Sequence, residues 1–481
     1  MENFIKLTFA NSKTELNGKP QVFLGNKSCT TFAEWNWDGE KLIVQNDRFG
    51  FYPIYYLEKP NEIIVSNSIS KLLEFDESKE LNDNAFGVFL RLGWLIGNDT
   101  LFASIKALPP ASVLTWQNGK MEIVSQEIVY SKKLEISRNE AIKIYDELFQ
   151  KAIEKTLPKD EKFAVPISGG RDSRHILFEL HKQNLLPDAC LTLVHPPPRP
   201  NEDLKIAKQI CEELNLKHFQ IEQNKTRFDA ERRKNVLTGF SVNEHGWFLA
   251  LADFVKDRWQ TVYDGIAGDV LSAGLFLNEK RLSLFEQGKF EELADEIFEK
   301  EAFLPVILDQ KTYQKYSRER AVNYLCKELT KHADAPNPIG SFFFWNRTRR
   351  CIAVSPFNLF GDSVNVVSPY LENELFDFLA TLPANLLLDH RFHTDTISFA
   401  YPKLAHIPYE DKNSPLNYDF NAFKNYSLDI LKFSLTARNK RLINRKFLLL
   451  RHLRSMLHKS QLQAVVDFGE QAVNLLQIER L

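Results

Sequence analysis

The stretch VPISGGRDSRHI, residues 165–176, combines an apolar run, a Ser-Gly-Gly turn and the start of a helical pattern. Two glycines can take positive φ and let a ligand approach the backbone, and a helix that starts there offers unpaired N–H groups at its positive end. Ser168 and Ser173 add hydroxyl donors. Asp172 would repel a phosphate, so its place in this anion site implies a bridging cation, usually Mg²⁺. The stretch predicts a nucleotide site with Mg²⁺; an ordinary strand-to-helix turn with an aspartate cap is the alternative.

The segments around this stretch alternate between strand and helix patterns, which predicts a parallel sheet covered by helices. Ligands bind such sheets at the carboxyl ends of the strands, where the Ser-Gly-Gly turn lies. The expected strands are FAVPIS (163–168), ACLTLV (189–194), KHFQIEQ (217–223) and TVYDG (261–265), and the expected helices begin at Ser173 and Asp203. From residue 275 onward the pattern is mostly helical.

A second glycine-containing turn, DGIAGDVLSAG at residues 264–274, follows the last of these strands. It contains Asp269, and two carboxylates at the ends of two parallel strands could share one Mg²⁺. By itself Asp269 is equally well explained as a helix cap. The sequence contains no Walker-type G-x-x-x-x-G-K-[ST] loop, and no G-x-G-x-x-G follows the first strand.

Residues 1–130 have a different character, with short apolar or alternating runs broken by Gly, Pro and Asn, which predicts a β-rich domain. One helical pattern, NDNAFGVFLRLGW (82–94), interrupts them. At Ser137 and Glu140 a capping-box signature starts the next helix. A chain of 481 residues exceeds a single hydrophobic core, so two domains are expected, divided at about residue 130.

The net charge, the cysteine pattern and the lengths of the apolar runs argue against several classes of function. The formal net charge of −2 gives no basic field for nucleic acid or an anionic membrane. The five cysteines are scattered and never spaced C-x-x-C. This pattern argues against a disulfide framework and a structural zinc site, and it is typical of proteins of the reducing cytosol. We expect no signal peptide and no membrane span. The basic segment 436–459 predicts a surface helix with a solvated cationic face, with a membrane or partner contact as the alternative.

The synthetase-like half of the chain resembles the asparagine synthetases. SGGRDS resembles the S-G-G-x-D-S pyrophosphate loop of ATP pyrophosphatases, and NEDLKIAKQICEELNLKHFQIE (201–222) resembles the segment after their second strand. DGIAGDVLSAG resembles their second loop, and VSPYLENELFDFLATLP (367–383) resembles their V-P-F-L-D segment. The resemblance implies ATP and Mg²⁺ as cofactors, with the metal bound by Asp172 and Asp269. The implied nucleotide-binding residues are Ser168, Gly169, Gly170, Asp172, Ser173 and Gly268.

The N-terminal half is similar to the class II glutamine amidotransferase domain of the same family. NDRFGFYPIYYLEKPNEIIVSNSISKLLEF (46–75) resembles its D-R-x-G-x-x-P-L-Y-Y segment, and TLFASIKALPPAS (100–112) resembles T-x-F-x-x-I-x-x-L-P-P-G-x. The implied fold is α/β: an N-terminal α+β sandwich, then a doubly wound parallel-sheet ATP-pyrophosphatase domain with a helical C-terminal part. The implied domains are 1–130 and 131–481.

Both halves also depart from the family pattern. The family's glutaminase uses an N-terminal cysteine, whereas position 2 is Glu2 and the domain contains only Cys29, which has no free α-amine to act as base. β-Lactam synthetases and lasso-peptide macrolactam cyclases depart in the same way. Val270 replaces an acid after the second-loop aspartate, and Asn365 stands near the position of a glutamate that takes part in nucleophile handling.

The sequence allows two interpretations of several further polar residues. Lys412, in EDKNSP, resembles the family lysine that stabilises charge on the adenylate; alone it would be a solvated loop lysine. The three arginines of WNRTRR (345–350) either meet phosphates or a carboxylate, or form a solvated basic face. His393 and Asp395, in HRFHTD, could be acid–base groups, but we expect a surface helix.

These observations predict an AMP-forming carbon–nitrogen ligase without glutaminase activity, acting through an acyl-adenylate. Its expected partners are a small-molecule or peptide carboxylate and an amine, in specialised metabolism or in peptide or polysaccharide modification. An ammonia-dependent asparagine synthetase-like enzyme and an inactive nucleotide-binding scaffold are the alternatives. The substrates and the oligomeric state, a homodimer included, are left open.

Overall fold

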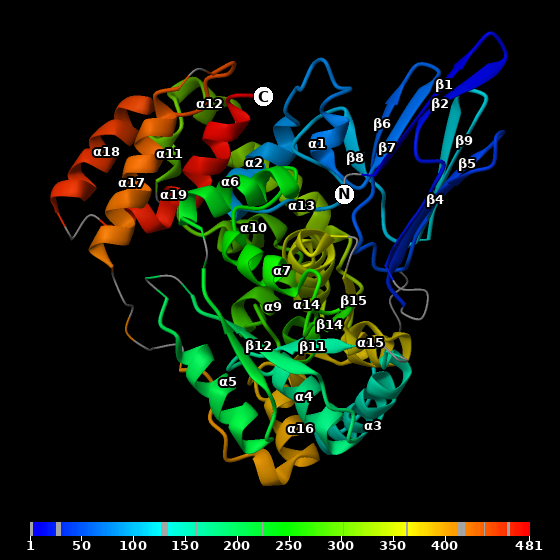
Figure 1. Ribbon diagram of the computed structural model, residues 1–481, viewed down its shortest axis with the longest axis vertical. Coiled ribbons are helices and arrows are strands. Elements are labelled where there is room, and N and C mark those ends of the chain that lie inside the picture. The colour runs from blue at the N-terminus through cyan, green and yellow to red at the C-terminus, as the bar shows by residue number, and fades with distance from the viewer. Residues whose placement is uncertain are drawn as a thin grey trace.

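Two antiparallel sheets form the N-terminal part of the computed structural model, at the upper right of Figure 1. The structure describes residues 3–25, 30–126, 133–158, 162–195, 197, 199–223, 225–301, 303–361, 364–411, 415, 419–436, 438–458 and 462–481. Each sheet has five strands, in the orders β2-β1-β7-β6-β8 and β10-β9-β5-β4-β3. The strands are β1 Phe4–Ala10, β2 Lys13–Gly18, β3 Gln21–Gly25, β4 Phe32–Trp37, β5 Leu42–Asn46, β6 Tyr55–Lys59, β7 Glu62–Ser66, β8 Ile105–Ala107, β9 Ser112–Gln117 and β10 Lys120–Ser125.

The two sheets pack as a sandwich because alternate residues of their strands point into one core. In β1 and β4 the buried positions alternate, and Leu7, Trp35 and Trp116 from the two sheets belong to one buried cluster. Helices α1 (Ile69–Leu72) and α2 (Asp83–Leu92) flank the sheets, and the side chain of Asn82 caps the start of α2. This part confirms the expected α+β sandwich.

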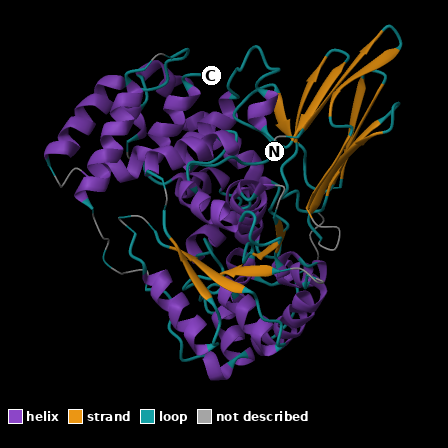
Figure 2. Ribbon diagram, viewed as in Figure 1, coloured by secondary structure: helices purple, strands orange, loops and turns teal. Residues whose placement is uncertain are grey.

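A third sheet lies in the lower half of the molecule between layers of helices (Figure 2). All its pairings are parallel, and its order is β13-β12-β11-β14-β15. Its strands are β11 Phe163–Pro166, β12 Ala189–Leu193, β13 His218–Ile221, β14 Thr261–Tyr263 and β15 Asn365–Val367. The chain builds outward from β11 to β13 and then returns to the other side of β11. The crevice for a ligand in such a sheet lies at this reversal, between the ends of β11 and β14.

Helices cover both faces of the parallel sheet: α4 and α5 lie on one side and α7 on the other (Figure 1). The helices of this half are α3 Arg138–Thr156, α4 Asp172–Lys182, α5 Glu202–Glu213, α6 Arg227–Leu237, α7 Leu249–Val255, α8 Gly268–Ser272, α9 Glu279–Glu286, α10 Phe290–Phe298, α11 Leu304–Ile307, α12 Gln310–Lys315, α13 Arg318–Thr330, α14 Pro338–Phe343, α15 Asn373–Thr381, α16 Phe392–Ala400, α17 Phe420–Ser434, α18 Arg445–Leu457 and α19 Leu462–Ile478. The doubly wound α/β class is therefore confirmed.

Arg349 and Arg350 neither reach the nucleotide site nor face solvent, so both sequence interpretations of them were wrong. They lie in the π-helical segment η2 (Phe344–Ile352) and are buried. Arg349 donates to the carbonyl of Gly97 at 2.6 Å, and Arg350 donates to the carbonyl of Asp99 at 2.6 Å. The buried guanidiniums thus satisfy backbone carbonyls of the N-terminal part and join it to the C-terminal part.

The basic segment near the C-terminus forms α18, but its exposed face is not simply cationic. Lys446 and Arg454 are exposed as expected, and so are leucines along the same helix. The exposed leucines are Leu449, Leu450, Leu453 and Leu457. The expected solvated cationic face is therefore only partly present. In the described residues, no helix combines the length and the apolar character that a membrane crossing requires.

Candidate nucleotide and metal site

The two glycine-containing turns meet at the carboxyl ends of β11 and β14, as predicted. They line one pocket of about 800 Å³ together with the ends of β12 and segments from residues 244–251 and 347–352. The sequence-predicted residues Ser168, Gly169, Gly170, Asp172, Ser173 and Asp269 all line this pocket. Gly268 does not line the pocket but lies directly against Asp172, which does.

The first turn is held by its own side chains and by α5. The N–H of Gly169 donates to Asp203 Oδ1 at 2.8 Å, and the N–H of Gly170 donates to Ser168 Oγ at 3.2 Å. Ser173 Oγ accepts from the N–H of Ser168 at 3.2 Å. Two backbone donors that could meet an anion are therefore already bonded in this conformation.

Gly169 of the first turn is needed for space, and neither glycine of this turn has an unusual backbone conformation. Neither Gly169 nor Gly170 has a positive φ, so the turn does not use the left-handed conformation that glycine permits. A Cβ on Gly169 would lie 3.1 Å from the Cβ of Glu410 and 3.2 Å from Asp203 Oδ1. The loop is thus packed between α5 and the segment that contains Glu410.

The glycines of the second turn let it lie directly on Asp172. A Cβ on Gly265 would lie 2.5 Å from Asp172 Cβ, and a Cβ on Gly268 would lie 2.5 Å from Asp172 Oδ1. With no side chains in the way, the N–H of Asp269 donates to Asp172 Oδ2 at 3.1 Å. Ala267 adopts φ +81 between these glycines, a conformation that costs roughly 1 kcal/mol or more and is typical of functional turns.

The two carboxylates form a site that fits a cation. Burial raises the pKa of Asp172 well above its ordinary value, and the neighbouring charge of Asp269 raises it further. Asp172 Oδ1 and Asp269 Oδ1 are both buried atoms without a hydrogen-bond partner. Two unsatisfied carboxylate oxygens at close range are an unfavourable arrangement that a divalent cation corrects. Asp172 and Asp269 would hold this cation.

His393 also belongs to this site, contrary to the expectation of a surface position. It lies on α16, its side chain is fully buried, and its Nδ1 is 3.4 Å from Asp172 Oδ1. Burial, aided by the charge of Arg171, lowers the pKa of His393 to about 3, so the imidazole is neutral at pH 7. Asp395 on the same helix faces outward and pairs with Arg138 at 2.8 Å. His393 and Asp395 are two positions apart, about half a turn of helix, so they lie on opposite faces of α16.

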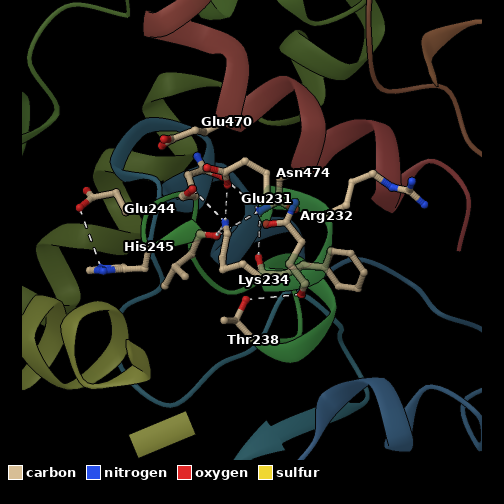
Figure 3. Close-up of polar contacts among 12 residues, drawn as sticks. Glu231, Arg232, Lys234, Thr238, Glu244, His245, Glu470 and Asn474 are labelled. Atoms are coloured by element: carbon tan, nitrogen blue, oxygen red, sulfur yellow. Dashed lines mark hydrogen bonds and ion pairs between the residues drawn. The ribbon is translucent and has the colours of Figure 1, made fainter. Parts of the chain in front are cut away.

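Polar contacts to Lys234 of α6 hold the loop that leads to His245, one of the residues lining the pocket (Figure 3). Lys234 is buried, and its Nζ donates to the carbonyls of Val242 and Asn243 at 2.7 and 2.8 Å. Glu231 Oε2 balances the ammonium at 3.4 Å. This contact fixes the loop that presents His245 to the pocket, where its Nε2 lies 3.7 Å from Cys351 Sγ.

The segment preceding Lys412 rests on the first turn. The N–H of Glu410 donates to the carbonyl of Gly169 at 3.2 Å, and Arg174 donates to the carbonyl of Pro408 at 2.6 Å. Tyr409 and Glu410 line the pocket. Lys412 itself lies outside the described residues, as do Glu2 and Cys29, so its role stays a prediction.

Two departures from the family pattern have different structural meanings. Val270 is buried in α8, where it lines this pocket and a second cavity of about 600 Å³ that residues from both parts of the chain enclose. Asn365 pairs with Thr261 at the amino ends of β15 and β14, whereas the pocket lies at the carboxyl ends of the strands. Asn365 does not line the pocket. An amide at that position therefore says nothing about the chemistry of this site. Arg347, in contrast to Arg349 and Arg350, does line the pocket.

Sequence reasoning missed Asp203 and His393 as site residues. Asp203 is buried, receives the Gly169 N–H and pairs with Arg199 at 3.0 Å. An acidic residue at the start of the second helix was the available signal for it. His393 had no local signal, because its role follows from the packing of α16 against α4 through the two histidines His175 and His393.

Replacing Gly268 by alanine is expected to weaken cation binding about tenfold, because the added methyl would overlap Asp172 Oδ1 and force that carboxylate away. Gly170→Ala is the control for loss of a glycine in the facing turn, because its added Cβ would meet only Ser168 Oγ at 3.2 Å. Calorimetric titration with Mg²⁺ measures both variants. Wild-type affinity in Gly268→Ala would show that the cation does not use Asp172.

Comparison with known proteins agrees with this architecture. The family model described as a glutamine amidotransferase domain matches residues 25–128, and the one described as asparagine synthase matches residues 145–393. The chain is 24% identical over 215 residues, 40% of its own length, to asparagine synthetase [glutamine-hydrolyzing] 2 of Bacillus subtilis (strain 168). The aligned part spans 27% of that relative's length.

Solved structures resemble the chain only distantly. NMN synthetase from Francisella tularensis is 18% identical, with 34% of this chain and 75% of that chain covered and a TM-score of 0.19. The U34-tRNA thiolase NcsA from Methanococcus maripaludis is 12% identical, with 56% and 84% covered and a TM-score of 0.24. The asparagine synthase match, in contrast, covers more than half of the sequence, and the chain belongs to the asparagine synthase family.

Proposed function

We propose that this protein is an ATP-dependent, AMP-forming ligase that makes an amide or lactam through an acyl-adenylate. The observation that carries the proposal is the convergence of two turns from adjacent parallel strands, which places Asp172 and Asp269 in contact inside a pocket of about 800 Å³. A pocket of this size accommodates a nucleotide together with a second substrate. Family membership supports ATP use and amide formation.

In the proposed reaction a substrate carboxylate attacks the α-phosphate of ATP and pyrophosphate leaves. An amine then attacks the acyl carbon, and AMP leaves as the amide forms. Ser168 and Ser173 would donate to the pyrophosphate, and Gly169, Gly170 and Gly268 would keep the two turns close enough to enclose it. Asp172 and Asp269 would hold Mg²⁺, which neutralises phosphate charge when bound. Lys412 would stabilise the negative charge that develops on the α-phosphate.

The proposed division at residue 130 assigns the adenylation chemistry to residues 131–481. All the pocket residues named above belong to that part. The sandwich formed by residues 4–125 would serve as a scaffold whose glutaminase function is lost.

We predict that the purified protein releases no glutamate from glutamine. Cys29 is the one cysteine of residues 1–130, and a cysteine inside the chain lacks the free α-amine that serves as base in this family. An enzyme-coupled glutamate assay measures this, with Cys29→Ala as the matched variant. Glutamate release that Cys29→Ala abolishes would make Cys29 a nucleophile and refute the prediction.

Pyrophosphate release over a panel of carboxylates, each with and without candidate amines and with ammonium, tests the proposed function. The expected result is release that depends on one class of carboxylate and on a divalent cation. Amide formation with ammonium alone would favour the ammonia-dependent alternative. Tight nucleotide binding without release for any carboxylate would favour an inactive scaffold.

A further inference from the structure

Three buried donor atoms converge at the two carboxylates, not two. Asp172 Oδ1, Asp269 Oδ1 and His393 Nδ1 are all buried without a hydrogen-bond partner. One donor atom from each of the three residues lies within 4.8 Å of the other two. The residues come from three elements far apart in sequence, the starts of α4, α8 and α16. Unsatisfied buried polar atoms are uncommon, and three that meet at one point indicate a shared ligand.

The contacts of the other imidazole nitrogen orient His393 for ligation. His393 Nε2 lies 3.1 Å from His175 Nδ1 and 3.4 Å from the hydroxyl oxygen of Tyr370. That hydroxyl donates its proton to the carbonyl of Asp172 at 3.2 Å, so its oxygen is free to accept from Nε2. With the proton on Nε2, the lone pair of Nδ1 faces the carboxylates. Metal-bound histidines in proteins show this arrangement, in which the distal N–H donates to a neighbouring group.

The separation of the donors suits one shared ion. The 3.4 Å between His393 Nδ1 and Asp172 Oδ1 is a few tenths of an ångström longer than the roughly 3.0 Å between neighbouring ligands that each lie about 2.1 Å from an octahedral ion, so a small shift of either side chain would let both bind it. His175 holds the imidazole from behind, and its ring stacks on Phe149 at 3.7 Å between centroids. Both histidines are fully buried, so the position of Nδ1 is set by packing.

We propose that His393, through Nδ1, is a third protein ligand of the cation held by Asp172 and Asp269, and that this nitrogen makes the site prefer Mn²⁺ to Mg²⁺. Mg²⁺ takes oxygen ligands, whereas imidazole nitrogen binds transition-metal ions. The inference rests on the proposed function for its cation site, and it adds a ligand and a metal preference to it.

Pulsed EPR on the wild-type protein tests the ligand directly. The probe is Mn²⁺ with inorganic pyrophosphate, which contains no nitrogen that could mimic histidine. The expected result is electron spin-echo modulation from one directly bound ¹⁴N, which changes to the ¹⁵N pattern in protein labelled with ¹⁵N-histidine. Bound Mn²⁺ without nitrogen modulation would overturn the inference. It would mean that His393 Nδ1 carries a proton and donates to Asp172.

Metal affinities separate a ligand from a structural role. His393→Asn keeps a neutral oxygen near the position of Nδ1 and is expected to weaken Mn²⁺ binding about tenfold or more, since even loss of a supporting partner of a ligand commonly costs that much. Mg²⁺ affinity should change less than about threefold. Equal losses for both ions would indicate distortion of the site and refute ligation. His195→Asn, which removes another buried imidazole lining the same pocket, is the control and should leave the Mn²⁺ to Mg²⁺ ratio unchanged.

The outcomes distinguish this inference from the proposed function. If Mg²⁺ supports pyrophosphate release while bound Mn²⁺ shows no nitrogen modulation, only the role of His393 is refuted. If neither ion binds with pyrophosphate, the cation site of the proposed function fails, and this inference with it.

Discussion

Replacing Asp172 by asparagine is expected to lower ATP–pyrophosphate exchange by about 10³-fold or more, while the unfolding temperature without cation stays the same or rises. The loss of activity follows because a neutral amide cannot hold the cation that offsets phosphate charge, an effect of several kcal/mol. The gain or retention of stability follows because Asp172 is poorly solvated and lies beside Asp269, so its charge opposes folding. Exchange kinetics and thermal unfolding on the same preparation measure both effects.

Asp269→Asn is the matched variant and should behave in the same way, because the negative charges of the two neighbouring carboxylates repel each other. Asp377→Asn is the control: Asp377 is 55% exposed and pairs with Arg48 at 2.6 Å, a surface ion pair worth at most about 1 kcal/mol. It should leave exchange unchanged. If Asp172→Asn and Asp269→Asn both exchange pyrophosphate like the wild type, the cation binds elsewhere. A marked loss of unfolding temperature in both would mean that the pair stabilises the fold.

Replacing Lys412 by alanine is expected to lower kcat about 10²-fold, with a smaller effect on KM for ATP. A lysine that stabilises charge developing on the α-phosphate acts mainly in the transition state, so its loss affects kcat most. Glu410, which precedes Lys412 by two positions in the sequence, lines the pocket and donates its N–H to the carbonyl of Gly169. Exchange kinetics measure the effect until the carboxylate substrate is known.

Lys412→Arg should not restore full activity, because the guanidinium is larger and planar. Lys403→Ala, on the surface segment that precedes Tyr409, is a control for the loss of one positive charge. A solvated loop lysine predicts no change for either Lys412 substitution. Unchanged exchange in Lys412→Ala would remove this residue from the adenylation step.

Local patterns were sufficient for most of the fold. The strands β11 to β14 were predicted because buried parallel strands are short apolar runs bounded by turns. The cap of α3 was predicted from the capping-box pattern, and in the structure Ser137 accepts a hydrogen bond from the N–H of Glu140. The fifth strand, β15, was missed. It has three residues within a mostly helical region and exists because its backbone pairs with β14. Such a short strand leaves no periodicity to detect.

The candidate site was predicted where its residues are neighbours of a glycine turn and was missed where they are not. Asp172 and Asp269 follow such turns, and both line the pocket. Arg349 and Arg350 were misinterpreted because a basic run looks the same in sequence whether its guanidiniums meet water, phosphate or buried carbonyls. The burial of η2 against residues 97–99 decided the outcome.

The sequence by itself determined the class of the fold, the order of its strands along the chain and the two turns that carry carboxylates, since these depend on local spacing and backbone preference. Only the tertiary structure decided that Gly265 and Gly268 serve close packing on Asp172, and that Asp203 anchors the first turn. It also placed His393 beside the carboxylates, over 200 residues from Asp172 in sequence. These properties arise from contacts between distant elements, and no local pattern of residues encodes such a contact.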